Sequence, residues 1–335
     1  MSEGNKKKIL VVRYHTIGDT LFTLPFFKEL RNIVGEEYQI DALSNNGNEY
    51  ILKNIPYIDN IVNIDNIAPL RLRNFFKWYP VIKEYSKIYF LCCDKPLSVI
   101  AFLSGVKERT GFNLPAVEYN YFLTERVDYN VNVHAANTYL SLLHLNDYET
   151  KKIEFENIFK DIPKQTKFDL GSDYVVIHPI STGRLKDWSF DKWKSVLKHI
   201  TETGVNVVIT GSKKDYEKAQ ELVLSDKIFN LCGKTTMEET ISIINASKML
   251  IGIDSGLIHL AAILKKKSIL LHGSTSLAHW KPINDNCKII SKNFPCSPCS
   301  YLMTEPHRPV CDNVDCMCAI SADDVINAYE NLLNG

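Results

Sequence analysis

The feature that most constrains the fold of this 335-residue chain is a recurring alternation of short apolar runs with longer amphipathic ones. The apolar runs are rich in Val, Ile and Leu, which favour buried parallel strands. They read KKILVVR, YQIDAL and SKIYFLCC in the first half, and DYVVIHP, VNVVITG, KMLIGID, KSILLHG and CKIIS in the second. Short strands separated by helix-length segments predict an α/β protein with parallel sheets covered by helices on both faces.

The series of strand-like runs restarts at Tyr174, after the polar stretch KDIPKQTKFDLGSD. We therefore predict two open α/β domains, residues 1–168 and 169–335, both of ordinary domain size. Ligands of open α/β sheets gather at the carboxyl ends of the strands, where helix N-termini present free N–H groups. The polar residues that follow each strand are therefore the candidate site residues.

Composition narrows the class of protein. Lys plus Arg and Asp plus Glu both total 39, so no overall charge directs the chain to nucleic acid or to membranes. No apolar run reaches the roughly 20 residues of a membrane span, and the N-terminus passes from lysines directly into a strand, unlike a signal peptide. These observations predict a cytoplasmic protein.

The loop after strand 174–178 contains Ser181, Thr182, Gly183 and Lys186 before an expected helix. Hydroxyls, backbone amides and a lysine at such a place can hold a pyrophosphate. An ordinary connection with a solvated lysine explains the same residues. Neither G-x-G-x-x-G nor G-x-x-x-x-G-K-[ST] occurs, which disfavours a dinucleotide-binding or P-loop enzyme.

Two further strand ends carry acidic residues. Asp215 and Glu217 follow VVITG, where an acid can bind ribose hydroxyls or simply begin a helix. The run KMLIGID ends in Asp254 and continues into a helix with Ser255, Gly256 and His259. Asp254 can present its carboxylate to a polyol, cap that helix, or do both.

The first strand also ends in an acid, Asp19, which directly follows Gly18 in VVRYHTIGDTLFTLP. A glycine at this place lets the backbone approach a ligand closely. Asp19 either faces a ligand at the end of the strand or caps a helix expected from Leu21 to Arg31. The local sequence leaves both roles open.

Three segments, in this order, resemble glycosyltransferase family 9, the heptosyltransferases: TIGDTLFTLP, KDWSFDKW after HPIST, and DSGLIHLAA. The resemblance implies the GT-B fold, in which two Rossmann-like domains with parallel sheets face one another across a central cleft. It implies an acceptor in the N-terminal domain and a nucleotide sugar, ADP-heptose, in the C-terminal domain. It also implies an inverting displacement without a catalytic metal, with which the lack of a DxD motif at a strand end agrees.

The resemblance assigns roles residue by residue. Asp19 is implied as the general base that activates the acceptor hydroxyl, and Lys186 as the charge on the departing diphosphate. Thr16 and Gly18 belong to the acceptor side. The donor residues are implied to be Ser181, Thr182 and Lys186 for the diphosphate, Asp215 for the ribose, residues 233–238 for the adenine, and Asp254, Ser255, Gly256 and His259 for the sugar.

A basic and aromatic segment, APLRLRNFFKWYP, covers residues 68–80. Its cations, Arg71, Arg73 and Lys77, alternate with aromatic and aliphatic side chains, which suits an anionic amphiphile at a membrane surface. A similar segment in some heptosyltransferases implies a lipid A/Kdo-type core acceptor and a peripheral position on the inner face of the inner membrane. The alternative is a solvated face over a few core aromatics.

Five of the nine cysteines fall between Cys296 and Cys318, so their use is local and not that of a disulfide framework. A C-x-x-C followed by further thiols is typical of tetrahedral zinc or iron sites. We expect Cys296, Cys299, Cys311 and Cys316 to bind one structural ion, with Cys318 close enough to substitute. A cluster of reduced thiols is the alternative.

The sequence thus predicts a heptosyltransferase that acts on lipopolysaccharide inner core or a related surface glycan. A family 9 transferase with another donor sugar or a protein acceptor is the first alternative. A non-catalytic protein that binds a sugar nucleotide is the second, although the presence of both Asp19 and Lys186 argues against a degenerate site.

Overall fold

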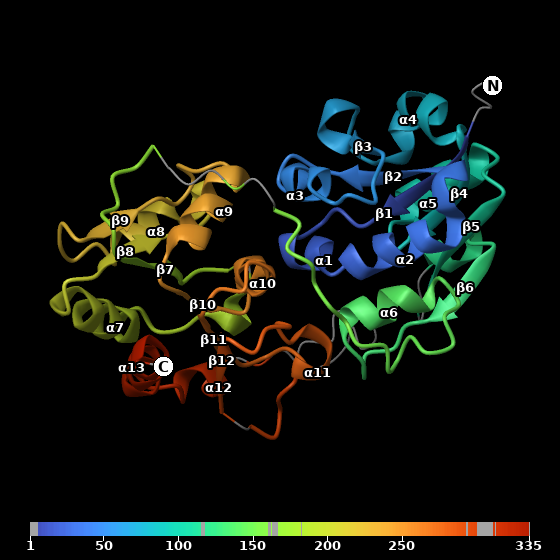
Figure 1. Cartoon of the computed structure of the whole chain (residues 1–335). Helices are drawn as coiled ribbons and strands as arrows, with labels where there is room; N and C mark the ends of the chain where they lie inside the picture. Colours follow the sequence, from blue (N-terminus) through green and yellow to red (C-terminus); the bar gives the residue numbers. More distant parts are fainter. Residues whose placement is uncertain are drawn as a thin grey trace. The chain divides into compact units, whose positions relative to one another are not determined.

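The computed structural model describes residues 6–114, 118–159, 162, 167–181, 183–292, 294–299, 311 and 313–334. The chain forms two compact units, residues 1–158 and 159–335 (Figure 1). The division falls before Phe159, earlier in the chain than the boundary predicted after residue 168.

The first unit is built on a parallel six-stranded sheet with the order β3-β2-β1-β4-β5-β6. Three of its strands are apolar runs that the sequence predicted: β1 (Lys7–Val12), β2 (Tyr38–Ser44) and β4 (Tyr85–Phe90). Three were missed: β3 (Asn60–Asn63), β5 (Glu108–Asn113) and β6 (Glu125–Asp128). Their sequences, NIVN, ERTGFN and ERVD, have no continuous apolar run, so only pairing with a neighbouring strand identifies them.

The helices of this unit are α1 (Ile17–Leu21), α2 (Leu24–Val34), α3 (Glu49–Lys53), α4 (Phe75–Ile82), α5 (Lys95–Leu103) and α6 (Ala135–Ser141). Figure 1 shows α2 and α6 on one side of the sheet and α4 on the other. The single helix expected from Leu21 to Arg31 is wrong. Two helices stand there, because Pro25 lies in the first turn of α2 and has no N–H to continue a helix from α1.

The second unit repeats this topology with the order β12-β11-β10-β7-β8-β9. Its strands are β7 (Tyr174–His178), β8 (Asn206–Ile209), β9 (Ile228–Asn230), β10 (Leu250–Ile253), β11 (Ser268–His272) and β12 (Cys287–Ser291). All but the three-residue β9 were predicted. Its helices are α7 (Phe190–Glu202), α8 (Tyr216–Gln220), α9 (Met237–Ala246), α10 (Gly256–Ile263), α11 (Leu277–Trp280), α12 (Asp315–Cys318) and α13 (Ala322–Asn334).

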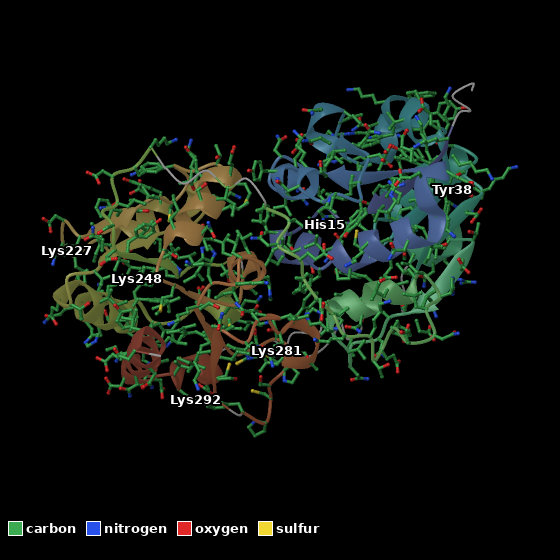
Figure 2. All side chains as sticks on the ribbon, viewed as in Figure 1. His15, Tyr38, Lys227, Lys248, Lys281 and Lys292 are labelled. Atoms are coloured by element: carbon green, nitrogen blue, oxygen red, sulfur yellow. The ribbon has the colours of Figure 1, made fainter. Side chains whose placement is uncertain are left out.

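The core of the second unit forms where helix faces cover this sheet. Trp193, Leu197 and Ile200, spaced three and four residues apart on α7, are fully buried. Helix α13 packs against α7 and buries Tyr329. At the end of β12, the Lys292 ammonium lies 2.9 Å from the carboxylate of Asp324, which ties this strand to α13 (Figure 2). Burial of each apolar side chain in this core contributes about 1.5–3 kcal/mol to the stability of the fold.

In each sheet the strand order reverses beside one strand, β1 in the first unit and β7 in the second. At such a reversal the connections leave in opposite directions, and open α/β sheets bind ligands at the carboxyl ends of these strands. Asp19 follows β1, Lys186 follows β7, and Asp254 follows β10, the neighbour of β7. The predicted α/β fold of parallel sheets is thus confirmed.

Candidate active site

Two residues that the sequence singled out separately meet in the second unit. Lys186 ends a short 3-10 helix, η5 (Arg184–Lys186), and its Nζ lies 2.8 Å from Oδ2 of Asp254. The same ammonium donates a hydrogen bond of 3.2 Å to the backbone carbonyl of Asp254. The two residues meet because β7 and β10 are paired, with His178 opposite Gly252 at their ends.

Asp254 is the centre of a buried polar cluster, with only 7% of its side chain exposed. The hydroxyl of Thr275 donates a hydrogen bond of 2.8 Å to Asp254 Oδ2, and His259 Nε2 lies 3.9 Å from Oδ1. Burial alone would raise the pKa of Asp254, but the charges of Lys186 and His259 hold it below its ordinary value. The carboxylate is therefore ionised at neutral pH.

Asp254 does not cap α10. Ser255 stands at the N-cap, with extended backbone angles and no side-chain bond to the helix. Its hydroxyl is buried and has no hydrogen-bond partner among the residues that the structure describes. Gly256 begins the helix and His259 lies buried one turn later. The Asp254 carboxylate is thus directed to Lys186 and Thr275.

The other residues of the predicted donor site surround the ends of β7 and β8. The Ser181 hydroxyl accepts a hydrogen bond of 3.3 Å from the backbone N–H of Gly183, while Thr182 lies outside the described residues. Asp215 accepts from the backbone N–H and hydroxyl of Ser212 at 2.7 and 2.6 Å, in a capping box. Glu217 is exposed on α8.

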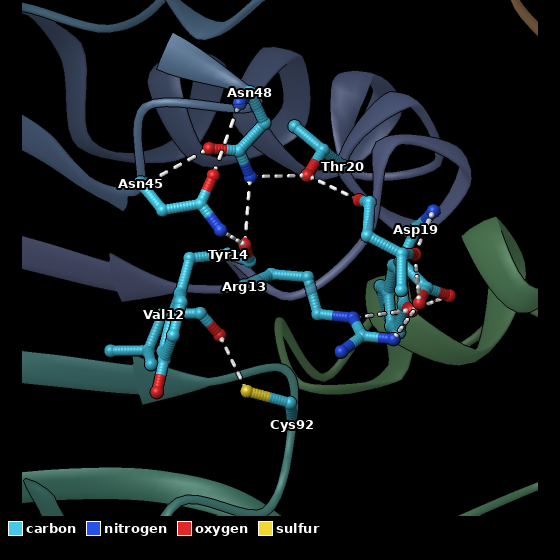
Figure 3. Close-up of polar contacts among 10 residues, drawn as sticks. Val12, Arg13, Tyr14, Asp19, Thr20, Asn45, Asn48 and Cys92 are labelled. Carbon is cyan, nitrogen blue, oxygen red and sulfur yellow. Dashed lines mark hydrogen bonds and ion pairs between the residues drawn. The ribbon is translucent and has the colours of Figure 1, made fainter. Parts of the chain in front are cut away.

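In the first unit, Asp19 lies in the first turn of α1 and is only 12% exposed (Figure 3). Its Oδ2 forms an ion pair with the Arg13 guanidinium and accepts a hydrogen bond of 2.6 Å from the Thr16 hydroxyl. Thr16 is the N-cap of α1 and accepts in return from the Asp19 N–H. Asp19 is therefore not the cap, and Gly18 is buried inside the helix.

Arg13 and Tyr139 were missed by the sequence analysis. Arg13 Nε donates a hydrogen bond of 3.1 Å to the Tyr139 hydroxyl, which lies 3.5 Å from Asp19 Oδ1. Burial would lower the pKa of Arg13, but Tyr139 and Asp19 raise it well above its ordinary value. An arginine directly after a buried strand is a usable signal for Arg13, whereas Tyr139 comes from α6 and has none.

The backbone of this turn is held by amide side chains from the end of β2. Asn45 and Asn48 both donate to the carbonyl of Tyr14, at 2.8 and 3.1 Å (Figure 3). Asn48 also donates to the Thr20 hydroxyl at 2.8 Å. The ring of His15, labelled in Figure 2, contacts that of Tyr14 in a tilted arrangement, with ring centroids 4.1 Å apart. The strand end that presents Asp19 is therefore rigidly fixed.

The basic and aromatic segment lies on the surface of the same unit. Arg71 is the N-cap of a short 3-10 helix, η3 (Leu72–Asn74), Arg73 lies within it, and Lys77 lies on α4; all three are exposed. Leu72 and Phe76 are 52% and 87% exposed beside them. Trp78 is buried and donates to the Ala68 carbonyl at 3.2 Å, which anchors the segment. Cations and apolar side chains thus share one exposed surface.

The four predicted cysteine ligands all lie within the described residues. Burial raises the pKa of the Cys316 thiol, and the neighbouring thiols of Cys299, Cys296 and Cys311 raise it further. The Val314 N–H donates to Cys311 Sγ at 3.3 Å. The exposed Cys318 instead has its Sγ 3.6 Å from the Asn313 carbonyl. Within the described part of the chain, no three His, Cys, Asp or Glu side chains are arranged to hold a metal ion.

One finding concerns membranes. Among the described residues, no helix is both long enough and apolar enough to cross a bilayer.

The sequence and the fold resemble those of known proteins. Lipopolysaccharide heptosyltransferase 3 of Escherichia coli K12 is 25% identical to the chain over an alignment of 350 positions, which covers 96% of each protein. The E. coli ADP-heptose lps heptosyltransferase II has the same fold, with a TM-score of 0.75, 20% identity and 98% of both chains covered. TibC of enterotoxigenic E. coli, a dodecameric iron-containing heptosyltransferase solved with ADP-D-β-D-heptose, has a TM-score of 0.63 and 15% identity; all of this chain and 78% of TibC are covered.

Two doubly wound units of equal topology, with these neighbours, define a glycosyltransferase of the GT-B fold. The family model described as glycosyltransferase family 9 (heptosyltransferase) matches residues 98–306. The chain belongs to that family. The matched region contains Lys186, Asp254 and Thr275, whereas Asp19 lies before it.

Proposed function

We propose that the protein transfers heptose from ADP-heptose to a lipopolysaccharide inner-core or related surface-glycan acceptor. The observation that carries the proposal is the Lys186–Asp254 pair at the ends of β7 and β10, in the region that matches the family model. A lysine at the point where the strand order reverses suits a bound diphosphate. The names of the relatives, lipopolysaccharide heptosyltransferases, support this donor and acceptor.

In this proposal the second unit, which contains the predicted donor domain of residues 169–335, binds the donor. Lys186 and the Ser181 loop bind the diphosphate, with Thr182 as a further expected contact. Asp254, Ser255, Gly256 and His259 face the heptose. Asp215 takes the ribose hydroxyls, which requires its carboxylate to bind a ligand while it also accepts from Ser212. The adenine lies near residues 233–238.

The proposed chemistry is a single inverting displacement. Asp19 takes the proton of the acceptor hydroxyl, whose oxygen attacks the anomeric carbon of the heptose as the bond to the diphosphate breaks. The electron pair of that bond leaves with ADP, and Lys186 neutralises the charge that develops there. Arg13 forms an ion pair with the Asp19 carboxylate and thereby orients it in the resting enzyme.

The acceptor side is proposed to lie on the first unit. Thr16 and Gly18 surround Asp19, and Arg71, Arg73 and Lys77 bind the anionic groups of a lipid A/Kdo-type core. The exposed Leu72 and Phe76 beside these cations support a peripheral position on the inner face of the inner membrane. Such a position is compatible with a cytoplasmic enzyme.

We further propose that Cys296, Cys299, Cys311 and Cys316 bind one structural zinc or iron ion. The thiols of Cys299, Cys296 and Cys311 contribute to the raised pKa of Cys316, whereas the Cys318 Sγ contacts the Asn313 carbonyl, which supports this ligand set over one that contains Cys318. The N–H donated to Cys311 Sγ would stabilise a thiolate ligand. The ion would order the segment and take no part in transfer.

A panel of donors tests the function. The protein is incubated with ADP-heptose, other ADP-sugars and UDP-sugars, each with delipidated core acceptors, and products are read by mass spectrometry. We expect heptosylated core from ADP-heptose only, with inverted anomeric configuration by NMR, and undiminished activity in excess EDTA. Transfer from another sugar would identify a different donor, and no transfer despite ADP-heptose binding would favour a non-catalytic protein.

A further inference from the structure

A chain of hydrogen bonds extends from Asp254 away from Lys186 into the core of the second unit. Asp254 Oδ2, the oxygen that contacts Lys186, also accepts from the Thr275 hydroxyl at 2.8 Å. Thr275 Oγ1 is 3.0 Å from His272 Nε2, and His272 Nδ1 is 3.3 Å from the Ser291 hydroxyl. Thr275 and His272 are 7% and 4% exposed. Neither residue is needed for the chemistry proposed above.

With His272 neutral, the hydrogen bonds that link Asp254, Thr275, His272 and Ser291 have only one arrangement in which every donor meets an acceptor. The Thr275 hydroxyl has a single proton, which Asp254 receives because an ionised carboxylate only accepts. His272 must therefore donate from Nε2, so its Nδ1 accepts from Ser291. A neutral imidazole meets this need, and burial lowers the pKa of His272 from its ordinary value. Every hydrogen bond then points toward Asp254.

The cysteine-bearing segment forms hydrogen bonds to the backbone of the turn that carries Thr275. The Gly273 carbonyl accepts from the Ser297 hydroxyl at 2.5 Å, and the Ser274 carbonyl accepts from the Cys299 N–H at 2.9 Å. A Cβ at position 273 would lie only 2.8 Å from Cys316 Sγ, so glycine alone lets α12 approach this closely. The backbone before Thr275 is thus fixed from two sides.

We propose that Thr275, oriented by His272, is a positioning residue that fixes the Asp254–Lys186 pair in the donor site. A lysine has many rotamers, and ordering its side chain costs free energy. A carboxylate held by a neutral donor keeps one orientation, so the ammonium that it binds keeps one position. Lys186 is thereby placed before the diphosphate arrives, which is the arrangement that electrostatic stabilisation of a leaving group needs. The link to the diphosphate rests on the proposed function.

The test compares Thr275→Val, which removes the hydroxyl at constant volume, with Thr275→Ser, which keeps it. Thr210→Val is the matched control, because Thr210 is equally buried and its hydroxyl binds only the end of β7, at the Ile177 carbonyl and beside His178. The first readout is the acetylation rate of the Lys186 amine in ligand-free protein, measured by mass spectrometry. We expect an increase of about threefold or more in Thr275→Val, and less in Thr275→Ser and Thr210→Val.

The second readout is the dissociation constant of ADP by calorimetry. Thr275→Val should weaken binding about tenfold when Lys186 is present. It should weaken binding by less than about twofold when Lys186 is already replaced by Met, because the threonine acts through the lysine. A merely structural role would give the same loss in both backgrounds.

The outcomes separate this proposal from the proposed function. An unchanged Lys186 reactivity in Thr275→Val, or equal effects of Val and Ser, would overturn the positioning role. A raised reactivity together with ADP binding that is indifferent to Lys186→Met would preserve the positioning role and refute the diphosphate assignment. If Thr275→Val does not fold, His272→Phe replaces it, and an unchanged reactivity in that variant would overturn the proposal.

Discussion

At the residue scale, Asp254 shows how burial and charge compete. Burial disfavours its charge, yet the neighbouring Lys186 and His259 lower its pKa in the folded protein. A carboxyl whose pKa is lower folded than unfolded stabilises the fold above its unfolded value of about 3.9. That contribution is lost as the pH falls through the folded value.

Asp254→Asn should therefore lower the stability of the protein by about 1–3 kcal/mol at pH 7, because the buried cluster loses its charge-assisted hydrogen bonds. The difference from wild type should shrink as the pH falls below about 4 and through the lowered pKa of the folded wild-type carboxyl. Thermal melts between pH 2 and pH 7 measure this, with the exposed Asp191→Asn on α7 as the control. A difference that does not change with pH would contradict the assignment.

Asp19, the proposed general base, is the second residue on which the proposed mechanism depends. Asp19→Asn keeps the shape of the side chain but removes the proposed base, so turnover should fall about 10²–10⁴-fold. The affinity for ADP should stay at the wild-type value, since the donor is assigned to the other unit. Steady-state kinetics and calorimetry on the same preparation check both parts. Turnover near that of wild type would show that Asp19 is not the base.

At the scale of secondary structure, strands with continuous apolar runs could be predicted, and short or polar strands could not. The run ILL of β11 is buried and apolar, whereas β5 buries Arg109, Thr110 and Gly111 through tertiary contacts alone. The site residues likewise divide into those that the sequence could predict and those that it could not. Asp254 directly follows a strand, Asp19 and Lys186 stand in the segments after strands, and all three could be found. Tyr139 joins them from α6 only through folding, and Thr275, although it follows β11, was not singled out.

The surface of η3 and α4 permits a test at this scale. Arg71→Glu with Arg73→Glu should raise the acceptor KM and weaken binding to anionic vesicles, with ADP affinity unchanged. The loss should diminish with added salt, because exposed charges are screened beyond about 8–10 Å near physiological ionic strength. Lys53→Glu with Lys152→Glu reverses two exposed charges elsewhere on the same unit and serves as control. Equal behaviour of the two double variants would leave an ordinary solvated surface.

At the scale of the whole molecule, the two units have the same strand order but present different chemistry where that order reverses. The first presents an acid paired with a buried arginine, and the second presents a lysine paired with a buried acid. In the proposed mechanism, the general base thus belongs to the first unit and the cationic leaving-group site to the second. The equal topology could be anticipated from the two series of apolar runs, but the pairing of Asp254 with Lys186 and of Arg13 with Asp19 could not.

The cysteine segment bears on the stability of the whole chain. Protein purified without oxygen should contain about one zinc or iron ion per chain, and its removal by a chelator should lower the melting temperature. Replacing Cys316 by Ser should abolish metal binding, while Cys318→Ser should preserve it, since the Cys318 thiol is exposed and directed to Asn313. Elemental analysis decides: freely titratable thiols without stoichiometric metal would indicate a reduced cysteine cluster.

The proposed function requires that Lys186 binds the diphosphate of the donor. ADP calorimetry with Lys186→Met measures this contact. Loss of one charge-assisted contact should weaken ADP binding about tenfold to a hundredfold. The control, Lys198→Met, removes an exposed ammonium from α7 of the same unit and should bind ADP as wild type does. Equal affinity of Lys186→Met and wild type would contradict the account.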